Sequence, residues 1–233
     1  MSEYKVCILA AGIGSRMKDF TKTFNKVLIP INGKPTICHI IEKFPKDVEI
    51  VVAVGYKKES VIDYLSTAYP DRKITFVEVD NFDKLGSGPG YSLLSCKSHL
   101  QCPFIQFAGD TLVKEDVPNV DKNWFGVSEV NNTERFSSVN IEGNKITRLD
   151  DKMKSDNKYA FIGLAGVKDY GHFWNSLENN KDMIKGEVQV SNGFKSLIEK
   201  ELFPEKFSWF DTGTMESYKH ALENYPNGTP YRG

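Results

Sequence analysis

Short apolar runs rich in β-branched residues alternate with segments of helical periodicity through the first 110 residues of the chain. Each run has the length of a strand and no polar face. This alternation predicts a mostly parallel sheet that is covered by helices on both faces. The expected strands are Lys5–Ala10, Glu49–Val54, Ile74–Val79 and Phe104–Ala108, and the helices expected between them are Thr36–Phe44, Glu59–Leu65 and Tyr91–Leu100.

After Asp110 the pattern changes to shorter strands joined by polar turns, and Glu142-Gly143-Asn144 is typical of a hairpin turn. Strands are expected at Trp124–Val130, Ser137–Ile141, Lys145–Leu149 and Phe161–Val167, and helices at Tyr170–Leu177, Gly193–Lys200 and Met215–Asn224. We therefore expect one α/β domain over residues 1–225, followed by a turn-rich tail at 226–233. Its centre would be a Rossmann-like mixed, mostly parallel sheet flanked by helices, with a small antiparallel lobe.

The composition is that of an ordinary globular protein. The 233 residues include 30 basic and 31 acidic side chains, and the net charge of −1 argues against a general binder of nucleic acid or membrane surfaces. The longest apolar runs are far shorter than the ~20 residues of a membrane span. Because the opening Met-Ser-Glu-Tyr-Lys lacks the basic region of a signal peptide, we expect a cytoplasmic protein.

The four cysteines form no Cys-x-x-Cys pair, so we expect reduced thiols. They are Cys7, Cys38, Cys96 and Cys102. Cys96, His99 and Cys102 are close in sequence, but no fourth ligand follows at the spacing of a zinc site. A structural zinc ion is therefore not expected.

A glycine-rich segment, Leu9-Ala10-Ala11-Gly12-Ile13-Gly14-Ser15-Arg16-Met17, directly follows the first expected strand. Its backbone amides can point at anionic oxygens, and parallel sheets bind ligands at this edge. A Walker P-loop is excluded because its Gly-Lys-Ser/Thr ending is absent. A dinucleotide fingerprint is weak, since Met17 replaces the third glycine and Gly55-Tyr56-Lys57 follows the second strand without an acid. A plain structural turn stays open on the glycines alone.

The segment that continues from these glycines is more specific. Gly12-x-Gly14-x-Arg16-Met17 is followed after eight residues by Asn25-Lys26-Val27-Leu28-Ile29-Pro30-Ile31-Asn32-Gly33-Lys34-Pro35. This pattern resembles the signature of the sugar-1-phosphate nucleotidylyltransferases, also called NDP-sugar pyrophosphorylases. The resemblance is to short forms that act on glucose 1-phosphate or phosphocholine.

Further motifs occur in the order of that family, so that the resemblance covers Lys5 to Ala221. They are Val52–Tyr56, Leu85–Gly90, Gly109-Asp110, Asp151-Lys152, Phe161–Leu164, Gly186–Asn192 and Trp209–Thr214. The chain departs from the pattern at Met153, where the family has proline, and at Ser191-Asn192, where it has Thr-Asp. The resemblance implies a nucleotide-diphospho-sugar transferase fold, with an NTP-binding half at about 1–115 and an acceptor-binding half at about 116–225.

The implied reaction is attack by a phosphate oxygen of a phosphorylated metabolite on the α-phosphorus of an NTP, with release of pyrophosphate. Because the nucleophile is already an anion, positioning and charge neutralisation are the main requirements. The resemblance assigns catalysis to Arg16 and Lys26, nucleotide binding to Leu9, Ala11, Gly12, Gly14, Ser15, Gly86 and Ser87, acceptor binding to Lys152, Gly163 and Glu187, and Mg²⁺ binding to Asp110 and Asp211.

The residue types suit these roles. A guanidinium such as that of Arg16 can hold pyrophosphate oxygens in pairs, and Mg²⁺ prefers carboxylates together with phosphate oxygens and water. Structural alternatives stay open at each position. Asp110 and Asp211 could form turns or cap helices, and Lys152 and Glu187 could be solvated surface charges.

We therefore expect an Mg²⁺-dependent nucleotidyltransferase of the EC 2.7.7 type, acting on a sugar 1-phosphate, in the setting of polysaccharide biosynthesis. Leu-Ala-Ala-Gly at positions 9–12 resembles the pyrimidine-using members and favours UTP or CTP. One rival is a CTP-dependent cytidylyltransferase for a phosphorylated non-sugar such as phosphocholine, and another is an inactive nucleotide-sensing homologue. The expected partners are an NTP and a phosphorylated small molecule, without nucleic acid or membrane, for a monomer or small homo-oligomer.

Overall fold

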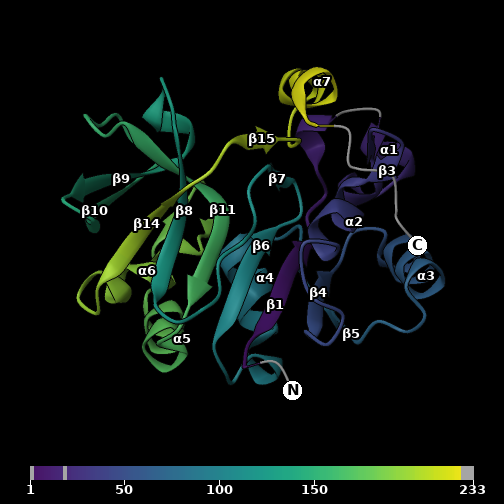
Figure 1. Ribbon diagram of the computed structural model, residues 1–233, viewed down its shortest axis with the longest axis horizontal. Coiled ribbons are helices and arrows are strands. Elements are labelled where there is room, and N and C mark those ends of the chain that lie inside the picture. The colour runs from purple at the N-terminus through teal and green to yellow at the C-terminus, as the bar shows by residue number, and fades with distance from the viewer. Residues whose placement is uncertain (1–2, 18–19, 227–233) are drawn as a thin grey trace.

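The computed structural model describes residues 3–17 and 20–226, and a nine-stranded sheet forms its centre (Figure 1). In spatial order the sheet contains β10 (Lys145–Asp151), β9 (Ser137–Glu142), β11 (Tyr159–Val167), β6 (Phe104–Ala108), β1 (Lys5–Ala10), β4 (Ile50–Val54) and β5 (Ile74–Glu78), with β8 (Asn123–Glu129) on β11 and β14 (Leu202–Lys206) on β8. The order places the first strand of the chain in the middle of the sheet.

Strand direction divides this sheet into two regions. β6, β1, β4 and β5 are parallel to one another, whereas β11 runs antiparallel to β6, β8 and β9. The prediction of a mixed sheet with its parallel part in the N-terminal half is thus confirmed. The later strands, expected as a small lobe, extend the same sheet, and Gly143 adopts a positive φ in the predicted β9–β10 hairpin.

Alternate residues of the strands build two apolar cores, one on each face of the sheet. Val6 and Ile8 face the core that α2 (Thr36–Ile41), α3 (Lys58–Ala68) and α7 (Met215–Asn224) cover. Cys7 and Leu9 face the core under three other helices. These are α4 (Pro89–Ser95), α5 (Tyr170–Asn179) and α6 (Ser191–Ile198). Burial of each large apolar side chain stabilises the fold by about 1.5–3 kcal/mol. The two cores therefore hold in place the carboxyl ends of the strands, where the site lies.

Several very short elements were not predicted, because two or three residues carry no periodicity. Three small two-stranded sheets pair β2 (Pro30–Ile31) with β3 (Lys34–Pro35), β7 (Thr111–Val113) with β15 (Trp209–Asp211), and β12 (Met183–Ile184) with β13 (Glu187–Val188). The chain also forms the one-turn helix α1 (Phe20–Thr23). The predicted helices at Thr36 and Tyr91 are shorter than expected, since α2 ends at Ile41 and α4 at Ser95.

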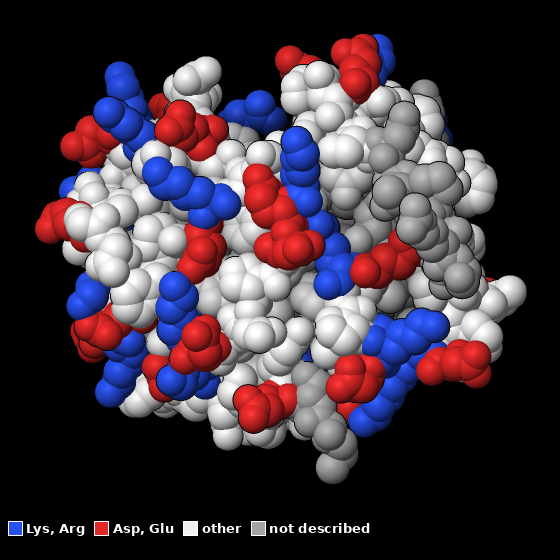
Figure 2. Space-filling model, viewed as in Figure 1, with Lys and Arg blue, Asp and Glu red and all other residues white. Residues whose placement is uncertain are grey.

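The cysteines are free thiols, three of them buried and Cys102 half-buried, as expected for reduced cysteines. Among residues 3–17 and 20–226, no helix is both long and apolar enough to cross a lipid bilayer. Of the predicted tail at 226–233, only Pro226 lies within the described residues. Acidic and basic side chains are interspersed over the face shown in Figure 2.

Candidate active site

A cleft of about 750 Å³ opens at the carboxyl ends of β1 and β6, the edge at which parallel sheets bind ligands. Its walls come from the glycine-rich loop after β1, the turn after β6, and the β12–β13 hairpin. It brings together all but one of the predicted site residues. Those in its lining are Leu9, Ala11, Gly12, Gly14, Ser15, Arg16, Lys26, Ser87, Asp110, Lys152, Gly163, Glu187 and Asp211.

Asn25 anchors the loop that carries the two predicted catalytic cations. Its fully buried side-chain amide donates hydrogen bonds to the carbonyl oxygens of Ala10 (2.9 Å) and Tyr56 (2.7 Å). Its side-chain oxygen accepts from the N–H of Val27 and caps the short helical turn that begins at Lys26. The amide of Asn25 thereby ties Lys26 to the ends of two neighbouring strands.

Gly14 lets the loop fold back closely enough to place Lys26. It adopts φ +69°, and a Cβ there would lie 3.0 Å from Cγ2 of Thr21 and 3.1 Å from Cβ of Lys26. A side chain at this position would therefore be strained and crowded. Gly12 differs, because a Cβ there would meet no atom within 4 Å. The loop thus packs at Gly14 and leaves open space at Gly12.

Lys26 and Asp110 form a largely buried ion pair on the cleft wall. The ammonium lies 2.7 Å from Oδ2 of Asp110, and the two side chains are 16% and 17% exposed. Burial alone would raise the pKa of Asp110, but the charges of Lys26 and Arg16 hold that pKa below its ordinary value. Asp110 is therefore an anion at neutral pH.

The β7–β15 pair brings Asp211 beside Asp110. Asp211 ends β15 opposite Thr111, the residue after Asp110. A Cβ placed on Gly213 would lie 2.9 Å from Oδ2 of Asp110 and also 2.9 Å from Oδ1 of Asp211, so the two carboxylate oxygens are at most twice that distance apart. Asp211 does not cap α7, because Thr214 does so in a capping box with Ser217.

The two carboxylates have the chemistry of a divalent-cation site. Burial and the charge of Asp110 raise the pKa of Asp211, so its anion is disfavoured unless a cation lies nearby. Within residues 3–17 and 20–226 no cluster of three or more His, Cys, Asp or Glu side chains could hold a metal ion. Two carboxylates fit Mg²⁺, which commonly completes its shell with water and substrate phosphate oxygens. The Asp110 and Asp211 pair therefore fits the predicted ion.

Lys152, another residue of the cleft lining, has a left-handed backbone conformation. It has φ +48°, its N–H donates to the carbonyl of Phe136 (2.9 Å), and its ammonium donates to Oε1 of Gln189 (3.0 Å). Burial lowers the pKa of this ammonium, while the carboxylate of Glu187 opposes the effect. Gly163 sits at an irregularity of β11 with φ +82°, where a Cβ would lie 2.6 Å from Cβ of Ala108.

Gly86 is the predicted site residue that the cleft lining does not include. Its N–H donates to the carbonyl of Gly186 (2.8 Å), and the carbonyl of the adjacent Ser87 accepts from Val188 N–H (2.7 Å). These bonds join the loop before α4 to the β12–β13 hairpin. The backbone N–H of Gly86 is thus engaged with the protein, whereas Ser87 borders the cleft.

Among the cleft residues that the sequence-based prediction gave no individual role are Gln106, Gln189 and Trp209. Within the described part of the chain, Gln106 Oε1 and Trp209 Nε1 are buried without a hydrogen-bond partner, and Gln189 is 5% exposed. The signal for Gln106 was present in the sequence, since it is a polar residue inside the apolar run Phe104–Ala108. Trp209 lies two residues before Asp211 on β15, so both project from the same face of that strand.

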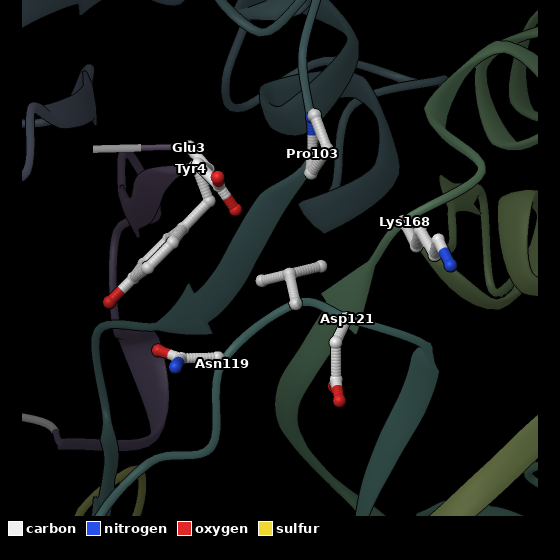
Figure 3. Close-up of a pocket in the computed structure, with 7 residues that line it drawn as sticks. Glu3, Tyr4, Pro103, Asn119, Asp121 and Lys168 are labelled. Carbon is white, nitrogen blue, oxygen red and sulfur yellow. The ribbon is translucent and has the colours of Figure 1, made fainter. Parts of the chain in front are cut away.

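A second pocket, of about 550 Å³, lies near the amino ends of β1 and β6. Figure 3 shows its side chains spread around the rim, with Lys168 on the far side from Tyr4. None of the predicted site residues lines it. It also lies at the edge of the sheet opposite to that at which α/β folds bind ligands, so the larger cleft is the candidate active site.

Sequence comparison bears on what this cleft does. A family model for MobA-like NTP transferase domains matches residues 6–125, which include the glycine loop, Lys26 and Asp110. The chain belongs to this family. The resemblance given by the motifs is thereby confirmed, and membership of this family supports an enzyme of the nucleotidyltransferase type.

Curated relatives extend the match beyond that region. The chain is 33% identical to the bifunctional protein GlmU of Methanococcus vannielii over 201 residues, which is 82% of this chain and 47% of the relative. The corresponding protein of Methanocaldococcus jannaschii is also 33% identical, over 83% of this chain and 47% of its own length. The chain thus spans about half the length of the curated relatives it matches.

Solved structures share the fold of this chain over nearly its whole length. A Bacillus anthracis protein assigned as a glucose-1-phosphate thymidylyltransferase superposes with a TM-score of 0.80 at 23% identity, covering 97% of this chain and 98% of the other. CTP:phosphocholine cytidylyltransferase from Streptococcus pneumoniae superposes with a TM-score of 0.76 at 22% identity, covering 95% and 99%. The predicted nucleotidyltransferase fold is confirmed.

Proposed function

We propose that the protein transfers NMP from an NTP to a sugar 1-phosphate, releasing pyrophosphate, with Mg²⁺ held by Asp110 and Asp211. The observation that carries this proposal is the convergence of Arg16, Lys26 and the two carboxylates on one cleft at the carboxyl edge of the sheet. These two cations and the ion bound by the two carboxylates would neutralise the charge of the reaction, in which two anions come together and pyrophosphate leaves.

The reaction forms one bond and breaks another at the α-phosphorus. A phosphate oxygen of the acceptor attacks that phosphorus, and its bond to the oxygen that bridges to the β-phosphate breaks as pyrophosphate departs. Since the attacking oxygen is already an anion, no side chain has to remove a proton. The protein's contribution is to hold the two reactants in line and to neutralise charge.

Arg16 and Lys26 supply the cations for the triphosphate. Nη2 of Arg16 lies 3.5 Å from the position of a Cβ on Gly213, the same point that both carboxylates face. A guanidinium there can hold two phosphate oxygens, and the Lys26 ammonium provides a compact second charge. When bound, Mg²⁺ would lower the charge on the α-phosphate and the leaving group.

Lys152, Gly163 and Glu187 are proposed to bind the acceptor. Lys152 supplies the cation for the acceptor phosphate, and Gln189 holds its ammonium in the cleft (3.0 Å). Glu187 is exposed on the β12–β13 hairpin and borders the cleft, where a carboxylate can accept hydrogen bonds from sugar hydroxyls. We accordingly assign the nucleotide to about residues 1–115 and the acceptor to about 116–225, within one domain at 1–225.

A pyrimidine NTP is the proposed donor, on the basis of Leu-Ala-Ala-Gly at positions 9–12. Ala11 is buried and, with Ser87, borders the side of the cleft next to α4. UTP or CTP would place its base on this side.

The test measures pyrophosphate release in the presence of Mg²⁺. Each of UTP, CTP, dTTP, ATP and GTP is paired in turn with several sugar 1-phosphates and with phosphocholine. We expect release with a pyrimidine NTP and a sugar 1-phosphate. Release with phosphocholine alone would contradict the sugar assignment, and NTP binding without release from any acceptor would indicate a sensor.

A further inference from the structure

Gln106 is a buried polar residue in the middle of the sheet. It lies on β6, the central strand between β1 and β11, and is 1% exposed. It shares a strand face with Phe104, which belongs to an apolar core. A glutamine in such a place loses contact with water and needs both ends of its amide paired.

Only one end of that amide has a partner. Nε2 donates a hydrogen bond to the carbonyl oxygen of Gly163 (3.0 Å), whereas Oε1 is buried without a donor. The bond to Gly163 fixes which end is the nitrogen, because a carbonyl can only accept. Gln106 lines the cleft, but its Oε1 is shielded from solvent, so a bound group must enter the cleft wall beside Gly163 to supply the missing donor.

The neighbours of Gln106 place it on the acceptor side. It pairs in the sheet with Ala165 of β11, and its amide reaches the β11 residue Gly163. The proposed triphosphate ligands, Arg16 and Lys26, instead belong to the loop after β1. We assign a ligand group that reaches Oε1 to the acceptor, because Gln106 contacts Gly163, a proposed acceptor residue. The nucleobase is proposed to lie instead beside Ala11 and Ser87.

We propose that Gln106 is a specificity-determining residue, whose Oε1 accepts a hydrogen bond from a hydroxyl or amide N–H of the acceptor. This inference rests on the proposed function and deepens it. A sugar hydroxyl can donate to the buried oxygen, but a quaternary ammonium such as that of phosphocholine has no N–H to offer. The cleft would therefore favour hydroxylated acceptors, because a bound acceptor without a donor leaves Oε1 unpaired.

The experiment compares acceptors that lack one donor at a time. Pyrophosphate release is measured with glucose 1-phosphate, N-acetylglucosamine 1-phosphate and their monodeoxy and monodeoxyfluoro analogues, because fluorine replaces a hydroxyl without donating. For the wild type we expect one ring position at which both replacements lower kcat/KM by about 10-fold or more. Equal, small losses at every position would overturn the inference.

Two variants connect that position to Gln106. Gln106→Met removes both amide groups at similar size, and the penalty at the one position should disappear while the penalties elsewhere remain. Gln106→Glu should keep the penalty, because a buried carboxyl is protonated and can both donate to Gly163 and accept. Gln101→Met makes the same change at an exposed glutamine and should behave as the wild type.

The outcomes separate this inference from the proposed function. Turnover of sugar 1-phosphates with an unchanged deoxy penalty in Gln106→Met would overturn the role of Gln106 and leave the transferase intact. Absence of turnover with every sugar 1-phosphate would overturn both. If Gln106→Met does not fold, Gln106→Leu makes the same test with another apolar side chain, and equal, small losses at every position in the wild type would still overturn the inference.

Discussion

The ammonium of Lys26 lies 2.7 Å from Oδ2 of Asp110, although 84 residues separate them in the sequence. The contact joins the signature loop after β1 to the end of β6. Asn25 fixes one partner through the carbonyls of Ala10 and Tyr56, and β6 fixes the other. The pair thus sets the distance between the proposed triphosphate ligands and the proposed metal ligands.

Asp110→Asn should lower kcat/KM by about 100-fold or more, because the neutral amide neither binds Mg²⁺ well nor stabilises charge. The fold should persist, since the change also removes the repulsion between Asp110 and Asp211. Pyrophosphate release and thermal unfolding measure the two effects. Asp63→Asn is the matched control, on an exposed part of α3. Normal turnover of Asp110→Asn would refute the metal assignment.

Lys26→Met should lower the rate by about 100-fold and also lower the Tm, because the Asp110 carboxylate keeps only Arg16 as a nearby counter-charge. The variant keeps the apolar stem of the side chain and removes the charge. Kinetics with the NTP as varied substrate, together with a thermal melt, separate the two effects. Lys219→Met, on the exposed face of α7, should change neither. A large fall in Tm with near-normal turnover would make Lys26 structural.

Mg²⁺ alone should stabilise the wild type, because it offsets the burial and the repulsion from Asp110 that together raise the pKa of Asp211. At saturating Mg²⁺ and constant ionic strength we expect the Tm to rise by about 1–4 °C. Asp211→Asn should lose this rise, as measured by calorimetry. An equal rise in the variant would mean that the ion binds elsewhere.

As the pH rises into the alkaline range, binding of the acceptor should weaken at a lower pH than binding of the NTP. The pKa of Lys152 is lowered by burial, so the ammonium loses its proton below the ordinary value of 10.5. The acceptor KM should therefore rise toward that pH, while the NTP KM stays flat. Lys152→Arg keeps its charge and should remove the rise, whereas Lys154→Arg, at an exposed lysine, should retain it. Parallel rises of both KM values would contradict the role of Lys152.

Mild acid should destabilise the fold through His39. Burial lowers the pKa of this ring, whose Nε2 lies 2.9 Å from the carbonyl of Ile31. The unfolded chain therefore binds the proton more readily, and stability falls as the pH drops below the ordinary value of 6.5. His39→Gln should reduce this slope in denaturation measured between pH 7 and 5, and the exposed His172→Gln should not. An unchanged slope in His39→Gln would assign the effect to other groups.

The sequence predicted the main strands because long apolar runs leave few alternatives. β1 and β6 have the expected bounds, and α7 begins and ends as expected. The pairing of β7 with β15 was not predicted, although it brings Asp211 to Asp110, because three-residue strands have no pattern of their own.

The cleft residues were predicted to different extents for a physical reason. Charged residues in a long motif stand out in the sequence, so Arg16 and Lys26 could be predicted as site residues, and both line the cleft. Gln106 belongs to no motif, and its importance depends on one unpaired atom that only the packing reveals. Gly86 was predicted to contact the nucleotide, but its N–H is bonded to Gly186 because the β12–β13 hairpin folds over that loop.

The most direct test of the central claim follows the phosphorus atoms. The protein, Mg²⁺, a pyrimidine NTP and a sugar 1-phosphate are observed by ³¹P NMR, with EDTA and Asp110→Asn as controls. The account predicts pyrophosphate and a nucleotide-sugar in equal amounts, and neither product in the controls. Pyrophosphate without a nucleotide-sugar, or equal product formation by Asp110→Asn, would contradict it.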